Sequence, residues 1–392
     1  MPESPQQILS TIGLPLLSLL GAALVAEILA RRWIRRGRYF VFRPGLKERM
    51  YLHRPTHPQM EPVVRRLVNE LGERGRPVPR EGRVFRVLVA GGSVVESYTL
   101  DQDTQWPAVI EAGLRTPEGL RTLGVDDAHV GNIGRSGVDG LTLELVLTRV
   151  LPNYPPLDLI VIMTGAGDVV RWMAEGAPHD RPASPLAESV LFAVRPDMPF
   201  GWAPGTCALA ELVRRLRARF WTTYPDAVSW MGRARRDRAS ATETRDEAPG
   251  NDVMLQAFRQ RLHGAVQVAA RHANRVLLVD HPLFDKESYA PEEDALMWNG
   301  GVGQAYRERQ TIFYSTQILC SLMRKVEAIT GEVAAREQVE HLAMRGLISP
   351  DATNFIDHIH LTPAGSIRVG AAIAAAVLRG SPGIAPSVDP HR

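Results

Sequence analysis

The chain has 392 residues, of which 45% are hydrophobic and 23% charged, so it is long enough for one large globular domain with appendages or for two domains. A formal net charge of +3 is too small to indicate nucleic-acid binding. Two cysteines, Cys207 and Cys320, exclude a disulfide framework and match no zinc-binding spacing, so we expect both to be buried as small hydrophobic side chains.

An apolar stretch without charged side chains lies between Glu3 and Glu27 and is long enough to cross a bilayer. We interpret residues 1–38 as a membrane anchor with a basic flank; a buried or interfacial helix is the alternative. A secretory signal peptide carries positive charge before its apolar stretch, whereas here the arginines follow it. The positive-inside rule therefore predicts a single-pass protein of the cell membrane with its remaining chain in the cytoplasm. Alternatively, the basic flank binds anionic lipid beside a helix oriented by other means.

Two further segments show no sustained periodicity. Residues 39–83 contain many Pro, Arg and Gly residues, and we expect them to form a stalk or arm. Residues 233–252 are charged and nearly devoid of large apolar side chains, which predicts a mobile insertion within a domain that spans residues 84–392.

From residue 84 onward, segments typical of strands alternate with segments typical of helices. Short aliphatic runs predict buried strands at 84–90, 128–133, 157–165 and 275–280. Helices are expected at about 104–115, 140–151, 252–272, 304–329 and 364–379. This alternation predicts a three-layer α/β/α, flavodoxin-like domain with a parallel sheet and a site at the carboxyl ends of its strands.

Polar residues and glycines stand where such a site forms: Ser93, the segments 132–137 and 165–168, and the pair Asp357 and His360 before the last helix. A serine hydroxyl becomes a nucleophile when a base removes its proton, and a histidine serves as that base when a third group fixes its tautomer. His360 and Asp357 are candidates for these two roles. The backbone N–H groups of Ser93 and Gly137 are candidate donors to an oxyanion.

Each of these features also has a purely structural explanation. A Gly-Gly-Ser turn is most often only a turn, and Asp357 could cap a helix beside a surface histidine. Asn132 could cap its own turn, and Asp168 the helix that begins near it. His358 does not fit the spacing, and we expect it to be exposed.

The order of these segments resembles the GDSL or SGNH hydrolase family over about residues 84–379. "VAGGSV" matches the first block of the family, "NIGRSG" the second and "DHIH" the last, while "NELGERG" (69–75) is similar to an arm that precedes Gly-Gly-Ser in membrane-anchored bacterial members. The resemblance implies Ser93 as nucleophile, His360 as base, Asp357 as its orienting acid and Gly137 in the oxyanion hole. It implies no metal and no other cofactor.

The third block departs from the family pattern, because Gly167 stands where the family has an oxyanion asparagine. Loss of one preorganised donor typically lowers turnover by about 100- to 1000-fold. We therefore expect a slow enzyme with an oxyanion hole at Ser93, Gly137 and Gly167. If the position at Gly167 is empty, an asparagine there should raise turnover at least about tenfold.

The sequence thus predicts a membrane-bound serine esterase that acts on acetyl or short acyl esters of a glycan, glycolipid or lipid. Trp172, Trp202 and Trp298 are candidate sugar-stacking residues, although packing would explain them equally well. Two alternatives stay open: an O-acyltransferase that uses the same triad, and a catalytically impaired glycan- or lipid-binding member of the family.

Other chemistries fit less well. "TGAGDVV" follows a strand, but Val170 occupies the third glycine position of a dinucleotide turn. His53 and His57 have an intervening proline and lack a third ligand, which disfavours zinc.

Overall fold

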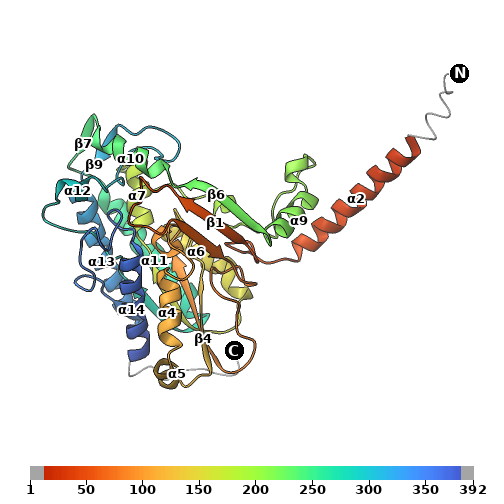
Figure 1. Ribbon diagram of the computed structural model, residues 1–392, viewed down its shortest axis with the longest axis horizontal. Coiled ribbons are helices and arrows are strands. Elements are labelled where there is room, and N and C mark those ends of the chain that lie inside the picture. Colours follow the sequence, from red (N-terminus) through yellow and green to blue (C-terminus); the bar gives the residue numbers. More distant parts are fainter. Residues whose placement is uncertain (1–12, 381–392) are drawn as a thin grey trace.

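Helix α2 (Leu14–Arg35) projects from the rest of the molecule in the computed structural model, which describes residues 13–380 (Figure 1). The remaining chain is built around a five-stranded parallel sheet in the order β10-β8-β5-β3-β4. Its strands are β3 (Val84–Gly91), β4 (Asp127–Asn132), β5 (Leu157–Met163), β8 (Ala273–Val279) and β10 (Glu340–Leu342). Counted along the chain, this is the 2-1-3-4-5 order of flavodoxin-like folds. The predicted fold class is confirmed.

The sequence of β5 explains its place in the middle of the sheet. It reads LDLIVIM, and every residue except Asp158 is buried. A continuous aliphatic run is typical of a parallel strand that is covered on both faces. All four expected strands form close to their predicted bounds, whereas the edge strand β10 has only three residues and is too short to show a pattern.

Helices pack in two groups. The first group contains α4 (Trp106–Leu114), α5 (Pro117–Leu123) and α14 (Pro363–Arg379), and the second contains α6 (Gly140–Val150), α7 (Ala166–Ala174), α11 (Asn251–Ala270) and α13 (Thr316–Glu337). Because the central strands are buried on both faces, the two groups form the outer layers of the fold. The helix expected at 304–329 begins later, at Thr316, because β9 (Ile312–Tyr314) precedes it and pairs with β7 (Glu243–Arg245).

Residues 39–83 are not a stalk. They contribute β1 (Lys47–Leu52) and β2 (Val63–Leu67) to a second sheet, in which β1 also pairs with β6 (Trp221–Ala227). Met50 and Val64 are fully buried in a small core of their own. Buried residues alternate with more exposed ones in both strands, but Glu48 and Arg66 are among the buried ones, so the residue types did not show this alternation in the sequence.

The segment 233–252 is also more ordered than expected. It forms most of α10 (Trp230–Ala239) and then β7. Arg235 shows why its charges did not indicate mobility: its guanidinium donates to the carbonyl oxygens of Thr56 and Ile356, which belong to distant parts of the chain. An arginine side chain can join two segments by donating to their backbone carbonyl oxygens, and this contact needs no apolar surface.

The remaining elements are short or lie at the periphery: α3 (Ser93–Glu96), η2 (Leu151–Asn153), α8 (Glu188–Leu191), η3 (Pro204–Thr206), α9 (Ala208–Arg217) and α12 (Pro291–Asp294). Cys320 is buried, as expected, whereas Cys207 is partly exposed at the start of α9.

Within residues 13–380, α2 is the one helix long and apolar enough to cross a membrane. Its last turns nevertheless belong to the folded body, because Ala30 and Ile34 are buried beside Ala208 of α9. The Glu27 carboxylate accepts hydrogen bonds from the backbone N–H groups of Ala208 and Leu209, at 2.8 and 2.9 Å. The apolar helix is therefore joined to the body by specific contacts.

Candidate active site

Ser93 lies where β3, the strand between β5 and β4, turns into the short helix α3. The turn is tight: a Cβ on Gly91 would lie 2.0 Å from the carbonyl oxygen of Met163, so only glycine fits where β3 ends beside β5. Further along the chain, the indole N–H of Trp106 donates to the carbonyl oxygen of Val94 in α3 at 3.0 Å and so fixes the position of α3. The chain thus presents the Ser93 hydroxyl at the carboxyl end of the sheet.

Asp357 and His360 lie on a closed loop before α14. The loop is pinned at its base by a bridge between Phe355 and Leu361. Thr362 then caps α14 by accepting a hydrogen bond from the N–H of Gly365. These local contacts follow from the sequence, because Thr-Pro-Ala-Gly is a helix entry with a capping hydroxyl and a proline in the first turn.

A chain of hydrogen bonds joins the two segments. His360 Nε2 lies 2.8 Å from Ser93 Oγ, and His360 Nδ1 lies 2.8 Å from Asp357 Oδ2. Because a carboxylate only accepts hydrogen bonds, Nδ1 must carry the proton of a neutral imidazole, and Nε2 is left as the acceptor for the serine hydroxyl. The geometry is the one that the nucleophile, base and orienting-acid hypothesis requires.

The Asp357 carboxylate is completely buried but well satisfied. Oδ1 accepts the backbone N–H groups of Ile359 and His360, each at 2.9 Å, and Oδ2 accepts the indole N–H of Trp298 at 2.6 Å as well as His360. Burial alone would raise the pKa of Asp357, yet His360 and these donors hold it well below its usual range. Asp357 therefore stays ionised and keeps His360 in one orientation.

The loop after β4, which contains Gly137 and Val138, approaches the segments of Ser93 and Gly167 through a backbone contact. A Cβ built on Gly92 would lie 3.1 Å from the carbonyl oxygen of Val138, and one built on Gly167 would lie 2.2 Å from the same atom. The loop after β4 therefore reaches the ends of both β3 and β5, and Val138, which follows Gly137 in the chain, lies against the glycine that precedes Ser93. Within residues 13–380, the backbone N–H groups of Ser93 and Gly137 donate to no protein acceptor, which leaves both free for an oxyanion.

The position at Gly167 is not empty. The Val138 carbonyl fills the space in which a side chain would begin, so this site needs glycine for room. The neighbouring Asp168 does not cap its own helix either; it accepts the N–H of Gly140, at the start of α6, at 2.9 Å. Burial and the charge of Asp139 raise the pKa of Asp168 to about 7.

Arg74, in the "NELGERG" segment, supports the turn that carries Ser93. Its buried guanidinium donates to the carbonyl oxygens of Glu96, Ser97 and Leu100, at 2.9, 2.8 and 2.6 Å. The carbonyls of Glu96 and Ser97 end the short helix that begins at Ser93, and their partial negative charge attracts a cation. The segment acts as a brace behind the site, a role that its sequence alone did not specify.

Glu96 connects the short helix α3 to the loop after β4. Its carboxylate forms a buried ion pair with Arg66 at 2.8 Å and accepts the N–H of Ser136 at 2.6 Å. Burial would raise the pKa of Glu96, but Arg66 and Arg135 lower it overall. This contact fixes the loop that carries Gly137.

Three other histidines lie near the site, but their buried rings stay neutral. Burial and the neighbouring His360 lower the pKa of His281 to about 3. Burial and Arg235 lower the pKa of His57 to about 4. Burial and Arg238 lower the pKa of His358 to about 3. His358 is buried, so the prediction that it is exposed is wrong. His281 comes two residues after the end of β8, and its Nε2 accepts the N–H of Ala166 at 3.5 Å, so its position after a strand is a signal that the sequence contains.

The three candidate sugar-stacking tryptophans occupy different environments. Trp172 is fully buried and donates to the carbonyl oxygen of Pro178, so the prediction that it stacks on a sugar is wrong. Trp202 is exposed and lies over the guanidinium of Arg31, beside α2. Trp298 contacts the site through its bond to Asp357, which gives it a positioning role that the sequence did not indicate.

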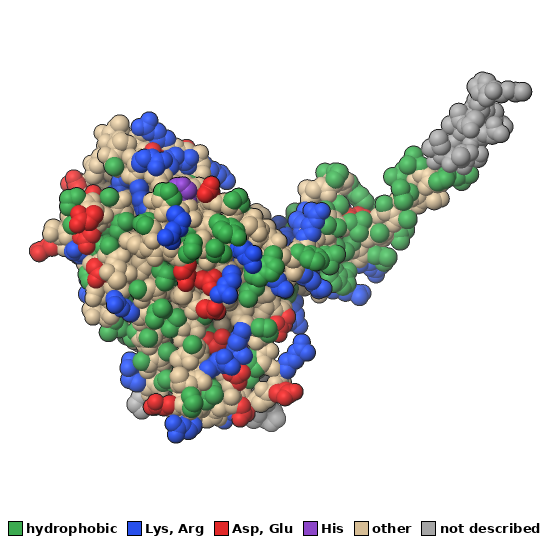
Figure 2. Space-filling model, in the orientation of Figure 1, with side chains coloured by type: hydrophobic (Ala, Val, Ile, Leu, Met, Phe, Trp, Pro, Cys, Tyr) green, Lys and Arg blue, Asp and Glu red, His purple; other side chains and the backbone are tan. Residues whose placement is uncertain are grey.

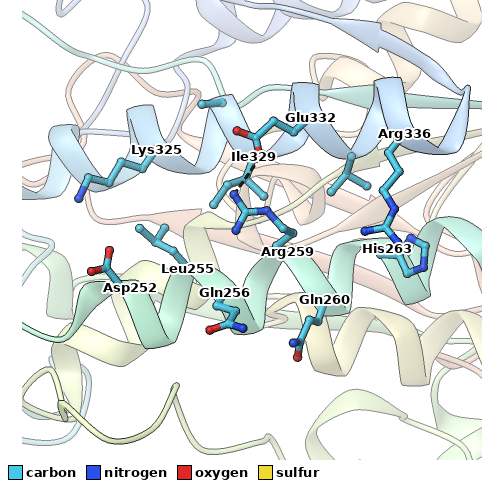
Figure 3. Close-up of a pocket in the computed structure, with 12 residues that line it drawn as sticks. Asp252, Leu255, Gln256, Arg259, Gln260, His263, Lys325, Ile329, Glu332 and Arg336 are labelled. Carbon is cyan, nitrogen blue, oxygen red and sulfur yellow. Dashed lines mark hydrogen bonds and ion pairs between the residues drawn. The ribbon is translucent and has the colours of Figure 1, made fainter.

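A groove of about 900 Å³ lies between α11 and α13 (Figure 3). Its floor includes Leu255 and Ile329, and an ion pair between Arg259 and Glu332, at 2.8 Å, crosses it. None of its lining residues belongs to the Ser93, His360 and Asp357 chain. The groove therefore does not contribute to the candidate active site.

No protein-family model matches the chain, and no curated protein sequence matches it either. Solved structures similar to it include a catalytic mutant of an acetylxylan esterase from Geobacillus stearothermophilus (12% identity, TM-score 0.41, 76% of this chain and 96% of that one). Another is a carbohydrate acetylesterase from Sinorhizobium meliloti (18% identity, TM-score 0.34, 75% and 98%). A third is an alpha/beta hydrolase enzyme from the metagenome of Lake Arreo, Spain (13% identity, TM-score 0.41, 74% and 94%). Identities this low leave the chemistry of the site to be argued from its own residues.

The contact at Gly167 predicts the effect of substitutions there. Gly167→Ala and Gly167→Asn should each lower the free energy of unfolding by about 1–3 kcal/mol, because the new Cβ displaces the Val138 carbonyl and with it the loop that carries Gly137. Denaturant unfolding of the detergent-solubilised full chain measures the change. Gly205→Ala is the matched control, since a Cβ there meets no atom within 4 Å. An asparagine variant with unchanged stability and higher turnover would contradict this steric account.

Proposed function

We propose that this protein is a serine esterase of the SGNH type, acting on acetyl or short acyl esters of a glycan, glycolipid or lipid. The observation that carries the proposal is the hydrogen-bonded chain from Ser93 through His360 to Asp357, with both histidine contacts at 2.8 Å. The three-layer fold and the strand order expected from the resemblance in sequence support it, because each matching block follows or precedes the element that the family pattern requires.

The reaction proceeds in two steps. Ser93 Oγ attacks the ester carbonyl carbon while His360 Nε2 takes the hydroxyl proton, and the backbone N–H groups of Ser93 and Gly137 stabilise the oxyanion. The intermediate collapses to an acyl-serine, and the imidazolium of His360 returns its proton to the leaving alcohol. A water molecule then attacks the acyl group, with His360 again as base, to release the acid and regenerate the serine.

Asp357 acts through His360 and does not touch the substrate. Its low pKa keeps the carboxylate ionised, so it stabilises the imidazolium that forms when the serine proton is transferred. Trp298 donates to Oδ2 of this carboxylate, whereas the backbone N–H groups donate to Oδ1. Transfer of the acyl group to a second alcohol is compatible with the same chemistry, as is an impaired member that only binds its ligand.

We also propose that α2 is a retained membrane anchor. The helix needs an apolar surrounding, because nine of its leucine, valine and tryptophan side chains are at least 49% exposed: Leu14, Leu16, Leu17, Leu19, Leu20, Leu24, Val25, Leu29 and Trp33. Cleavage after the helix, as in a signal sequence, would remove the buried contacts of Ala30 and Ile34 with α9. The basic flank favours a cytoplasmic catalytic domain at the cell membrane.

The first functional prediction concerns the nucleophile. A fluorophosphonate probe should label the wild-type protein and not Ser93→Ala, because the probe reacts with a hydroxyl that a neighbouring base activates. Hydrolysis of a chromogenic acetyl ester should fall by about 1000-fold or more in the same variant. Ser136→Ala is the matched control: Ser136 is an exposed serine in the adjacent loop, and its contact with Glu96 uses the backbone N–H. Labelling that persists in Ser93→Ala would remove Ser93 from the mechanism.

The second functional prediction concerns Trp298. Trp298→Phe should lower kcat about tenfold with little change in KM, because loss of the hydrogen bond to Asp357 loosens His360 and costs roughly 1.4 kcal/mol in the transition state. Steady-state kinetics on the chromogenic ester gives both constants. Trp202→Phe, at a tryptophan that lies over Arg31 instead, should leave both unchanged. Equal effects of the two substitutions would argue against a positioning role for Trp298.

The third functional prediction concerns membrane orientation. Because the arginine-rich flank follows the apolar segment, a reporter fused after Arg392 should be active if it works only in the cytoplasm. A reporter that requires export should be inactive at the same position. The reverse pattern would place the catalytic domain outside the cytoplasm and make an external glycan the better candidate substrate.

A further inference from the structure

The region around α9 exposes an unusual set of large apolar side chains, which we call the α9 surface. Their exposed fractions lie between 45% and 69%, and the members are Trp202, Val213, Leu216, Phe220 and Trp221. Figure 2 shows hydrophobic side chains extending from the projecting helix onto the adjoining part of the body, with Lys and Arg beside them. A patch of this kind on a soluble face would favour aggregation, so it calls for a covering partner.

The sequence of α9 explains why its apolar stripe is only half covered. Leu209 and Leu212 pack against the last turns of α2. Val213 lies four positions after Leu209 and Leu216 four positions after Leu212, so they continue the same stripe, but both are exposed. The exposed half of α9 therefore adjoins the apolar surface of the projecting helix.

Specific polar contacts fix the α9 surface against α2. Glu27 accepts the first two N–H groups of α9, and Arg31 pairs with Glu27 at 2.7 Å. Arg31 also donates to the carbonyl oxygens of Phe200 and Gly201 and lies beneath the Trp202 ring. These contacts fix the position of the α9 surface relative to α2. A bilayer that surrounds α2 would therefore also contact the α9 surface.

The charges of this region have one sign. Residues 199–225 contain one acidic residue, Glu211, which is buried and paired with Arg43, Arg214 and Arg215. The exposed charges are arginines: Arg217 and Arg219 from this segment, and Arg32, Arg35 and Arg36 from the end of α2. Apolar and aromatic side chains rimmed by arginines match the interface of a bilayer that contains anionic lipids.

The geometry points to a lipid surface as the partner of the α9 surface: Val213, Leu216 and Phe220 enter the boundary between headgroups and acyl chains, and the arginines bind lipid phosphates. This inference rests on the proposed membrane anchor and extends it. The protein would touch the membrane at two joined sites, a spanning helix and an interfacial helix. The second contact would restrain the body against rotation about α2 and hold the Ser93 site at a set height above the lipid.

Spin-label accessibility in the full chain tests this inference. Cys207 is replaced by serine, and single labels are placed through Val213→Cys, Leu216→Cys and Phe220→Cys in protein reconstituted into vesicles of phosphatidylcholine and phosphatidylglycerol. Labels at these positions should be at least about threefold more accessible to oxygen, relative to a water-soluble nickel complex, than labels introduced by Leu347→Cys and Ile367→Cys. The two controls are matched in exposure, at 51% and 47%, but lie elsewhere on the body.

A label at Leu20→Cys, within α2, separates failure of the inference from failure of the anchor. If the Leu20 label is in lipid while the α9 labels match the aqueous controls, the anchor stands and the α9 surface does not bind lipid. If the Leu20 label is aqueous as well, the anchor fails too. If the α9 labels are shielded from both reagents and show spin–spin broadening, a second copy of the chain covers the surface, and the lipid inference is overturned.

Discussion

The buried carboxylate of Asp357 is the charge on which the arrangement of the site depends. An ionised group without solvent is stable only if donors surround it, and here two backbone N–H groups, the Trp298 indole and His360 do so. The two N–H groups and the His360 ring belong to the loop that carries Asp357, whereas Trp298 comes from a distant segment, so satisfying this one charge orders the loop and fixes it against the rest of the fold. The tautomer of His360, and hence its ability to accept the Ser93 proton, follows from that alignment.

The rest of the site is organised by close backbone approach. Gly91, Gly92 and Gly167 allow β3, β5 and the loop after β4 to come together with carbonyl groups where side chains would otherwise stand. Arg74 and Glu96 then fix this arrangement from behind, one through carbonyl oxygens and the other through the N–H of Ser136. The proposed oxyanion donors, the N–H groups of Ser93 and Gly137, are thus backbone groups on loops that other residues hold in place, and they would need little reorganisation during the proposed reaction.

The same use of arginine recurs away from the site. Arg235 ties the helix α10 to the loop that carries Asp357, and Arg31 ties α2 to the segment before α9. Both guanidinium groups bind carbonyl oxygens that no secondary structure satisfies. A membrane-proximal helix and a catalytic loop are thereby joined to one body, although the sequences around these arginines look polar and irregular.

The sequence by itself determined the elements whose signals are local: the aliphatic strands of the parallel sheet, the Thr362 cap, the apolar α2 and the order of blocks that places Ser93, Asp357 and His360 at strand and helix ends. These follow from periodicity and turn chemistry within a few residues. Only the tertiary structure decided that residues 39–83 form strands, that Trp172 is buried while Trp298 binds Asp357, and that Gly167 meets the Val138 carbonyl. Each of these depends on a partner distant in the chain, and neither hydrophobic pattern nor residue type specifies which distant atoms will fill a given space.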